Sequence, residues 1–268
     1  AIADAAAAEV AKMLGKEEAY QYLDNRSHSW LNYFDESTGF VRGKSSTGEW
    51  REDFNPFNAS RIANEYCEGN AWQYTWLVPQ DLDLLVERFG GVEKSLERLD
   101  GLFTAESKME GEDVTPDISG LIGQYVHGNE PSHHIIYFYT MLGEPWKAAD
   151  RLYEVMATMY STEPDGLSGN EDVGQMSAWY VMTTLGFYPV EPASGKYVLG
   201  VPMVDGVEID VEGGIFRVER AGYSEANRYV QSVELNGVAL DRNYITHEEV
   251  IAGGLLKFNM GAEKSVWY

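Results

Sequence analysis

Apolar residues recur at helical spacing over the first two thirds of the chain and alternate with polar residues over the last third. The helical spacing predicts seven helices, over about 4–14, 17–34, 80–89, 92–104, 132–142, 145–160 and 173–185. Gly15, Gly90, Gly143 and Gly186 follow four of them and favour helix termination. The first two helices are expected to form a hairpin, because the link between them is short.

The pattern changes to β-structure at Phe187. Strands are expected over about 197–199, 207–211, 215–218, 229–235 and 255–258, with hairpin turns at Asn236-Gly237 and Gly213-Gly214. The sequence therefore predicts a helical part over residues 1–186 and an antiparallel, β-rich segment over residues 187–268. Within the helical part, residues 35–64 form a long stretch without periodicity, and loops of this length are often functional.

Three clusters of carboxylates, amides and aromatic residues each precede a predicted helix. They span residues 65–76, 127–134 and 166–180. Asp172 in the third cluster is expected to be the N-cap of its helix. Short links make consecutive helices antiparallel, so these three alternate helices should start at the same end of a helical layer. The clusters are therefore expected to converge on one pocket.

The pooled side chains are rich in oxygen ligands. Hard cations such as calcium take six to eight oxygens, which suits Asn129, Glu130 and Asp172 better than a zinc site. His133 and His134 are adjacent in the sequence and should point about 100° apart on a helix, which argues against one shared zinc ion.

Carboxylates on separate loops also suit glycoside hydrolysis. That reaction needs one acid to protonate the leaving oxygen and one base to activate water. Tryptophans could pack on the apolar face of a sugar ring while Asn, Gln and His side chains bond its hydroxyls, although a single tryptophan is more often a core residue. His28 and His247 lie outside the clusters and are expected to have no chemical role.

Composition narrows the choice of partner. The chain has 268 residues, of which 44% are hydrophobic, so it can bury a sizeable core. Its formal charge of -23 disfavours nucleic acid and favours a neutral ligand or a cation. The single cysteine, Cys67, excludes an internal disulfide, and no stretch approaches the roughly 18 apolar residues of a membrane span. No signal-peptide pattern is present, although the sequence starts at Ala1.

Together, the stretches Glu68 to Trp76, Gly128 to His134 and Gly169 to Tyr180 resemble glycoside hydrolase family 92, the calcium-dependent exo-α-mannosidases. The resemblance extends through Gly186-Phe-Tyr-Pro and the tail Gly253 to Phe258, and so covers essentially the whole chain.

The resemblance implies inverting hydrolysis of terminal α-linked mannose on glycans. Glu68 matches the general acid and Asp172 the general base, with Glu65 left open as an alternative acid. Calcium, held through Asn129, Glu130 and Asp172 or its neighbours, is expected to bind the mannose 2- and 3-hydroxyls. Some members carry an acid where this chain has Asn170. The residues expected to bind substrate are Trp72, Gln73, His133, His134, Asn170 and Gln175.

The chain is far shorter than the family it resembles. Family members place a β-sandwich before an α/α toroid and a closing β-rich segment, whereas this chain has about seven of the twelve helices that a six-pair toroid needs. It is expected to be the C-terminal part, with a partial toroid that exposes apolar flanks. The missing N-terminal part is expected on another chain, or the chain is a trimmed product. The family implies a bacterial protein in the periplasm or outside the cell.

Two other interpretations stay open. The first is a non-catalytic fragment that folds or binds sugar without turnover. The second is a different toroid enzyme, such as a lyase acting on uronates. Anionic uronates usually need Arg or Lys in the site, and the three clusters contain neither, so the sequence favours the mannosidase.

Overall fold

A computed structural model of the chain describes residues 1–61 and 64–268. It contains two compact units. The first unit comprises Ala1–His133, Leu167–Asn170 and Glu191–Ser194, and the second comprises His134–Gly166, Glu171–Val190 and Gly195–Tyr268. The division expected near residue 186, into a helical part and a β-rich segment, stays a prediction.

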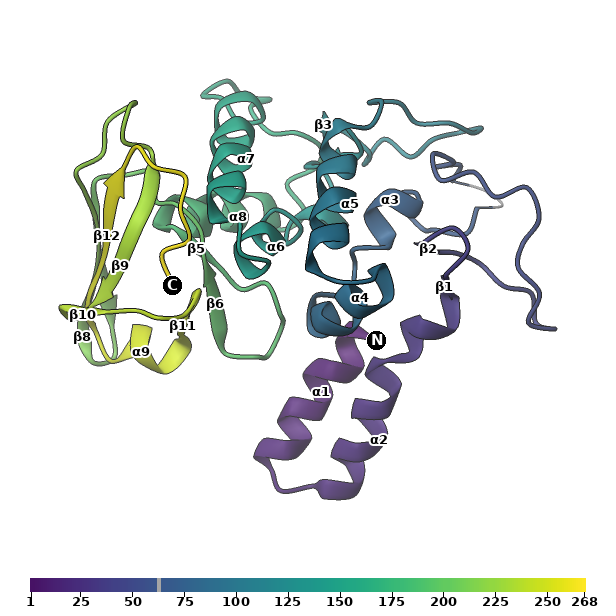
Figure 1. Cartoon of the computed structure of the whole chain (residues 1–268), viewed down its shortest axis with the longest axis horizontal. Helices are drawn as coiled ribbons and strands as arrows, with labels where there is room; N and C mark the ends of the chain where they lie inside the picture. The colour runs from purple at the N-terminus through teal and green to yellow at the C-terminus, as the bar shows by residue number, and fades with distance from the viewer. Residues whose placement is uncertain (62–63) are drawn as a thin grey trace. The chain divides into compact units, whose positions relative to one another are not determined.

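The first unit begins with the expected helical hairpin. Helices α1 (Ile2–Met13) and α2 (Glu17–Ser27) lie side by side (Figure 1). The prediction of one helix over 17–34 is wrong beyond Ser27, because a 3-10 helix, η1 (Ser29–Tyr33), follows. There His28 Nδ1 and Trp30 Nε1 both contact Asp81 Oδ2, at 2.7 and 2.6 Å, which turns the chain away from the axis of α2.

Two further helices form the core of the first unit. Helices α4 (Leu82–Phe89) and α5 (Val92–Thr104) follow the 3-10 turn η2 (Pro79–Asp81), and Gly90 ends α4 in the left-handed conformation with φ 91°. The side chains of Leu85, Leu99 and Leu102 are fully buried. These helices confirm the predicted ranges to within two residues.

Short elements in the first unit were not predicted. They are helix α3 (Ala71–Tyr74) and two antiparallel strand pairs, β1 (Phe34–Asp35) with β2 (Phe40–Val41) and β3 (Leu121–Ile122) with β4 (Tyr125–Val126). Elements of two to four residues are too short to produce a readable period.

The helix predicted over 132–142 is only partly correct. The chain forms a 3-10 turn, η3 (Glu130–Ser132), then a series of turns, and only then helix α6 (Tyr137–Met141). Backbone bonds span three residues here, as from the Ser132 amide to the Asn129 carbonyl and from the Tyr137 amide to the His134 carbonyl. Such bonds produce the tighter 3-10 geometry.

The second unit places helices beside two sheets. Its helices are α6, α7 (Pro145–Thr158), α8 (Gln175–Leu185) and α9 (His247–Ile251). A three-stranded antiparallel sheet has the order β11 (Tyr244–Thr246), β6 (Lys196–Leu199), β5 (Phe187–Tyr188). Helix α7 contacts strand β9 (Tyr229–Leu235), where Tyr229 Oη donates to Asp150 Oδ1 at 2.9 Å.

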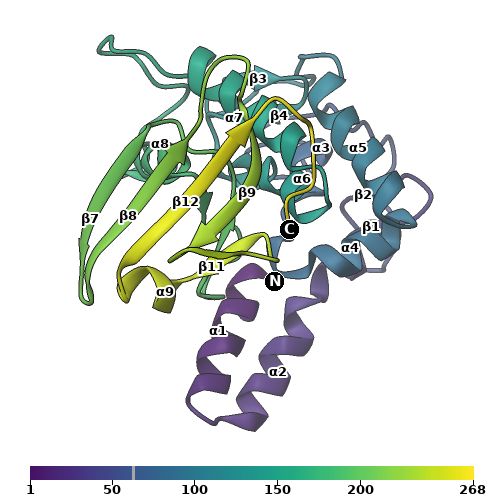
Figure 2. The same ribbon diagram turned by 60° about the vertical axis from the view of Figure 1, so that its left-hand side comes forward.

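The larger sheet has five strands. Their order is β10 (Val238–Ala239), β9, β12 (Gly254–Gly261), β8 (Gly214–Ala221), β7 (Gly206–Val211). Strands β9, β12, β8 and β7 lie side by side in Figure 2. The hairpin predicted at residues 213–214 is present, but its turn lies one residue earlier: Glu212 and Gly213 form it, and Gly214 opens β8 opposite Val211. The turn at residues 236–237 is confirmed between β9 and β10. Asn236 and Gly237 have φ 53° and 80°, as a type I′ turn requires.

One strand pairing corrects the expectation of an antiparallel segment. Strand β12 inserts between β8 and β9 and runs parallel to β8, with Gly254 opposite Phe216. Between β8 and β12 the chain passes through β9, β10, β11 and α9, a crossover long enough for a parallel pair. Phe216, Val233 and Phe258 are fully buried on the sheet. In the part of the chain that the structure describes, no helix is long and apolar enough to cross a membrane.

Candidate active site

A buried turn positions the first cluster in the first unit. Asn70 is the N-cap of α3 and forms a capping box with Gln73: its side-chain oxygen accepts from the Trp72 amide at 3.0 Å, and its own amide donates to Gln73 Oε1 at 2.8 Å. The Gln73 Nε2 group donates to the Gln124 carbonyl at 2.5 Å. Both polar atoms of Gln73 are therefore used inside the protein, so this predicted substrate-binding residue supports the turn.

Glu68 lies two residues before this turn and is exposed. Its amide donates to Tyr74 Oη at 3.2 Å. Asn129, from the second cluster, donates through Nδ2 to the Glu68 carbonyl at 2.8 Å and to Glu68 Oε2 at 3.4 Å. The structure thus brings the first two clusters into direct contact, and it holds the Glu68 carboxylate at the surface.

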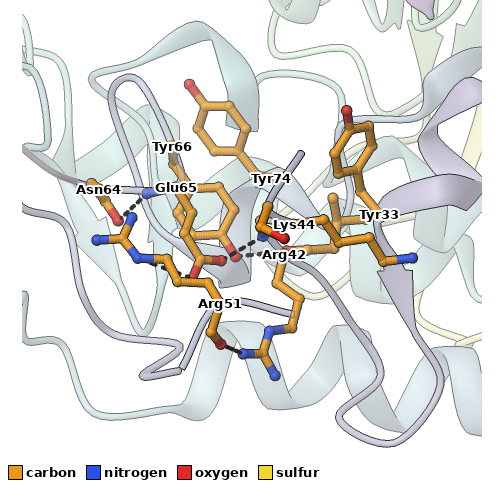
Figure 3. A pocket seen from close by; sticks show the side chains of 11 residues that line it. Tyr33, Arg42, Lys44, Arg51, Asn64, Glu65, Tyr66 and Tyr74 are labelled. Atoms are coloured by element: carbon orange, nitrogen blue, oxygen red, sulfur yellow. Dashed lines mark hydrogen bonds and ion pairs between the residues drawn. The ribbon is translucent and has the colours of Figure 1, made fainter. Parts of the chain in front are cut away.

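Glu65 has a different environment. Its carboxylate is largely buried, accepts from the Gly43 amide at 2.6 Å through Oε2, and has Oε1 4.0 Å from Arg51 Nε (Figure 3). A Cβ atom on Gly43 would lie 3.1 Å from Glu65 Cγ, so the glycine allows this close approach. Glu65 fixes the loop around Gly43, which leaves Glu68 as the exposed carboxylate of the pair.

Asn129 also begins the second cluster's 3-10 turn. It is buried, and its side-chain oxygen accepts from the Glu130 amide at 3.2 Å. Glu130 is half-buried one residue later. Both side chains offer oxygen ligands, the donor type that calcium prefers. Among residues 1–61 and 64–268, no three His, Cys, Asp or Glu side chains are grouped closely enough to hold a metal ion.

The histidines of the second cluster are buried. His133 Nε2 lies 2.9 Å from the His127 carbonyl oxygen, and His127 Nδ1 lies 2.9 Å from Tyr125 Oη. Burial, and then the neighbouring His133, lowers the pKa of His127 well below its usual value. In the second unit, the ring of His134 packs edge-on against Phe138. The role of His127 was not predicted, although its position at the start of the cluster was visible in the sequence.

Part of the third cluster also belongs to the first unit. A Cβ atom on Gly169 would lie 2.5 Å from the Gly128 carbonyl oxygen, so two glycines let these backbones touch. The exposed Asn170 donates through Nδ2 to Asp117 Oδ1 at 2.7 Å. Asp117 therefore joins the site, and no periodic or capping signal in the sequence identifies it.

The remainder of the third cluster lies in the second unit and corrects the predicted cap. The N-cap of α8 is Gly174, and Asp172 makes no capping bond. Instead Glu171 Oε2 accepts from the Gly174 amide at 2.5 Å, and Oε1 accepts from the Ser177 amide at 3.1 Å. The prediction of Asp172 as N-cap is wrong because its neighbour Glu171 takes those bonds.

Asp172 is exposed on a strained loop. Asp172, Val173 and Gly174 all have positive φ, at 50°, 55° and 102°. Left-handed geometry costs a non-glycine residue about 1–2 kcal/mol, and the cost is highest for a β-branched side chain such as Val173. Strained backbones of this kind concentrate at functional sites. Glu171 holds the loop, and the carboxylate of Asp172 faces solvent.

The aromatic residues of the clusters are mostly part of the core. Trp179 is fully buried and stacks on Tyr160 with ring centroids 6.1 Å apart. Trp72 is half-buried against Phe40, and its indole N–H has no acceptor among the described residues. Gln175 Nε2 donates to Tyr188 Oη at 3.2 Å. Among the tryptophans of the clusters, Trp72 is therefore one whose indole N–H is buried without an acceptor in the part of the chain that the structure describes.

Known proteins extend this picture. Residues 1–262 match the family model of the glycosyl hydrolase family 92 catalytic domain. An α-mannosidase of family GH92 from Bacteroides thetaiotaomicron, solved in complex with mannoimidazole, is 38% identical with a TM-score of 0.87, covering 96% of this chain and 34% of that chain. A GH92 inverting mannosidase from Bacteroides thetaiotaomicron VPI-5482 is 33% identical with a TM-score of 0.84, covering 98% of this chain and 36% of that chain.

A curated relative at greater distance is also described as a glycosidase. A protein of the fungus Arthroderma benhamiae, described as an uncharacterized secreted glycosidase, is 29% identical over 281 residues, covering 96% of this chain and 34% of its own length. The chain thus spans about a third of the length of the relatives it matches. The match over residues 1–262 shows that the chain belongs to glycosyl hydrolase family 92.

Proposed function

We propose that this chain carries catalytic residues for the hydrolysis of terminal α-linked mannose from glycans, with inversion at the anomeric carbon. One structural relative is described as an α-mannosidase and another as an inverting mannosidase. The observation that carries the proposal is the exposed Glu68 carboxylate, which Asn129 contacts from the second cluster. Two of the three motif clusters therefore meet at a carboxylic acid that substrate can reach.

The two carboxylates have different roles in this proposal. Glu68 donates a proton to the glycosidic oxygen as the bond to the leaving group breaks. Asp172 accepts a proton from the water molecule that attacks the anomeric carbon from the opposite face. Glu65 is assigned to structure, because its carboxylate is bonded to the Gly43 amide.

The donor chemistry fits a calcium ion. Asn129, Glu130 and Asp172 would hold it through amide and carboxylate oxygens. The Asn129 side-chain oxygen accepts a bond from the Glu130 amide, and an amide oxygen has two lone pairs. When bound, calcium would supply a positive charge for sugar hydroxyl oxygens. Trp72, His133, His134, Asn170 and Gln175 are the proposed sugar contacts, and Gln73 supports them from the buried turn.

The wider architecture follows the same proposal. The helical pairs α1–α2, α4–α5 and α6–α7 are joined by short links and pack against each other, as helices of an α/α toroid do. Helix α8 exposes Tyr180 and Val181, at 40% and 53% of their surface, as an incomplete toroid would. We propose that the rest of the catalytic region corresponds to the part of the longer family members that this chain does not span. A periplasmic or extracellular location is in line with the secreted fungal relative.

The experiment is hydrolysis of an α-linked mannobiose followed by proton NMR. Release of β-mannose before mutarotation, lost on adding EDTA and restored by calcium, is the expected result. Release of α-mannose would contradict inversion, and activity that survives EDTA would contradict the calcium site. Binding of mannose without release would favour the second interpretation, a fragment that binds sugar without turnover.

A further inference from the structure

The segment around Asp117 joins the second and third clusters within the first unit. The Gly128 amide donates to the Ser119 carbonyl at 3.0 Å. Two residues earlier in the segment, Asp117 Oδ1 accepts from Asn170 Nδ2 at 2.7 Å. A Cβ atom on Gly128 would lie 3.2 Å from the amide nitrogen of Gly169, so the backbones of the two clusters are close here as well. Asp117 thus lies where these clusters meet, although it belongs to neither.

The Asp117 carboxylate is held by its own segment. Its Oδ2 atom accepts from the hydroxyl of Thr115, a buried residue, at 2.7 Å. The Ser119 amide donates to the Asp117 backbone carbonyl at 3.0 Å, and the intervening Ile118 is buried in a small hydrophobic cluster. Asp117 therefore presents Oδ1 to Asn170 from a fixed position, while its other carboxylate oxygen is already bonded.

The chemistry of this pair decides which way the Asn170 amide points. A carboxylate only accepts hydrogen bonds, whereas a side-chain amide has an NH2 group that donates and an oxygen that accepts. The NH2 group of Asn170 must therefore face Asp117, and the carbonyl oxygen Oδ1 occupies the other branch of the amide. Because Asn170 is exposed, this oxygen can accept a hydrogen bond from a ligand.

We infer that Asp117 is a positioning residue, which holds the Asn170 amide so that its oxygen, rather than its NH2 group, faces a hydroxyl group of the sugar. The sugar hydroxyl then donates to Asn170 Oδ1. A side chain that is fixed before binding does not have to be ordered in the complex, and this saves free energy of association. The inference rests on the proposed contact between Asn170 and sugar, to which it adds a residue outside the three clusters and the polarity of the bond.

Asp117→Asn is the variant to test, because it keeps the size of the side chain and removes the fixed polarity. An amide at position 117 can donate to Asn170 Oδ1 or accept from Nδ2, so both orientations of Asn170 become possible. The kcat/KM for α-mannobiose should fall about fivefold. The urea midpoint should stay at the wild-type value, because the bond is exposed. Glu112→Gln, which removes an exposed charge from the same loop, is the matched control and should keep wild-type kinetics.

Two double variants separate positioning from a purely structural role. Asn170→Ala removes the contact that Asp117 supports, so adding Asp117→Asn to it should change kcat/KM by less than about twofold. Asp117→Asn combined with Asn170→Asp exchanges donor and acceptor, so position 170 again presents an acceptor, and kcat/KM should return to within about twofold of the wild type. Losses that multiply in the first pair, or no recovery in the second, would overturn the inference.

The inference and the proposed function fail in different ways. Wild-type kinetics in Asp117→Asn would overturn the inference and leave the proposed function standing. If the wild type releases no mannose, calorimetric titration with mannobiose applies the same comparisons to Kd, with the same expected fold-changes. A wild type that neither cleaves nor binds mannobiose would overturn the proposed function, and this inference with it.

Discussion

The buried turn around Asn70 in the first unit and the exposed loop around Asp172 in the second unit each carry a motif cluster, and they are built in opposite ways. At the turn, Asn70 and Gln73 lie in the core, where each polar atom has a partner. At the loop, Asp172 and Val173 are exposed, and left-handed backbone geometry sets their positions. The turn is held by buried hydrogen bonds, whereas the loop is held chiefly by the carboxylate of Glu171.

This difference predicts which substitutions lower stability and which lower activity alone. Loss of a buried polar partner leaves an unsatisfied group and destabilises the fold. Exposed loop residues contribute little to stability, so they can be replaced at a cost to chemistry alone. Stability and activity should therefore fall together at the turn and separately at the loop.

The largest effect is expected at Asp172. Asp172→Asn removes the proposed base and should lower the hydrolysis rate of mannobiose by about 10²–10⁴-fold. The free energy of unfolding should change by less than about 0.5 kcal/mol, because the side chain is exposed. Asp165→Asn, an exposed substitution before the same helix, is the matched control. Normal turnover by Asp172→Asn would disprove its role as base.

The next effect tests the buried side. Gln124 is fully buried, accepts from Asn70 Nδ2 at 2.8 Å and donates to the carbonyls of Glu106 and Lys108 at 2.7 and 2.8 Å. Gln124→Ala should lower the free energy of unfolding, measured in urea, by about 3 kcal/mol, because it leaves several buried polar groups without hydrogen-bond partners. Gln21→Ala, on the exposed face of α2, should cost little. A loss below about 1 kcal/mol at Gln124 would contradict the buried network.

A smaller, pH-dependent effect is expected at Glu171. Hydrogen bonds from the hydroxyl and then the amide of Ser177, followed by the Gly174 amide, lower the pKa of Glu171 below 4.5. A carboxyl whose folded pKa is lowered stabilises the fold above its unfolded pKa and loses that stabilisation as the pH falls through the folded pKa. Thermal melting should therefore show a lower Tm for Glu171→Ala than for the wild type at pH 7, with the difference closing below about pH 4. A difference that does not depend on pH would rule out this capping role.

The smallest effect concerns backbone strain. Asn adopts left-handed geometry more readily than a β-branched residue, so Val173→Asn should raise the free energy of unfolding by about 1 kcal/mol. Val173→Leu, which keeps an apolar side chain at the same φ, should raise the free energy of unfolding much less. Urea titration measures both, and a loss of stability in Val173→Asn would show that the loop is not strained at this residue.

Sequence predicted features that are set locally. Gly90 ends a helix and Asn236-Gly237 forms a hairpin turn because Gly and Asn themselves favour the positive φ that each position requires. The sequence pattern does not distinguish adjacent acids, so it indicates Asp172 as the cap, whereas Glu171 accepts the capping bonds.

Features set by distant parts of the chain were missed. The parallel pairing of β12 with β8 depends on a strand inserting between two others, and Asp117 joins Asn170 across 53 positions. His28 and Trp30 end the second helix through Asp81, more than 50 positions away. The approach of Glu68 and Asn129 agrees with the expected convergence of the first two clusters, while the roles of both residues stay proposals.

The most direct test of the proposed chemistry compares two substrates in Glu68→Gln. Fluoride leaves without a proton, whereas a sugar alkoxide needs one from the general acid. Hydrolysis of α-mannobiose should fall by about 10²–10⁴-fold in this variant, while hydrolysis of α-mannosyl fluoride stays within about tenfold of the wild type. Equal losses on both substrates, or full activity on mannobiose, would contradict Glu68 as the general acid.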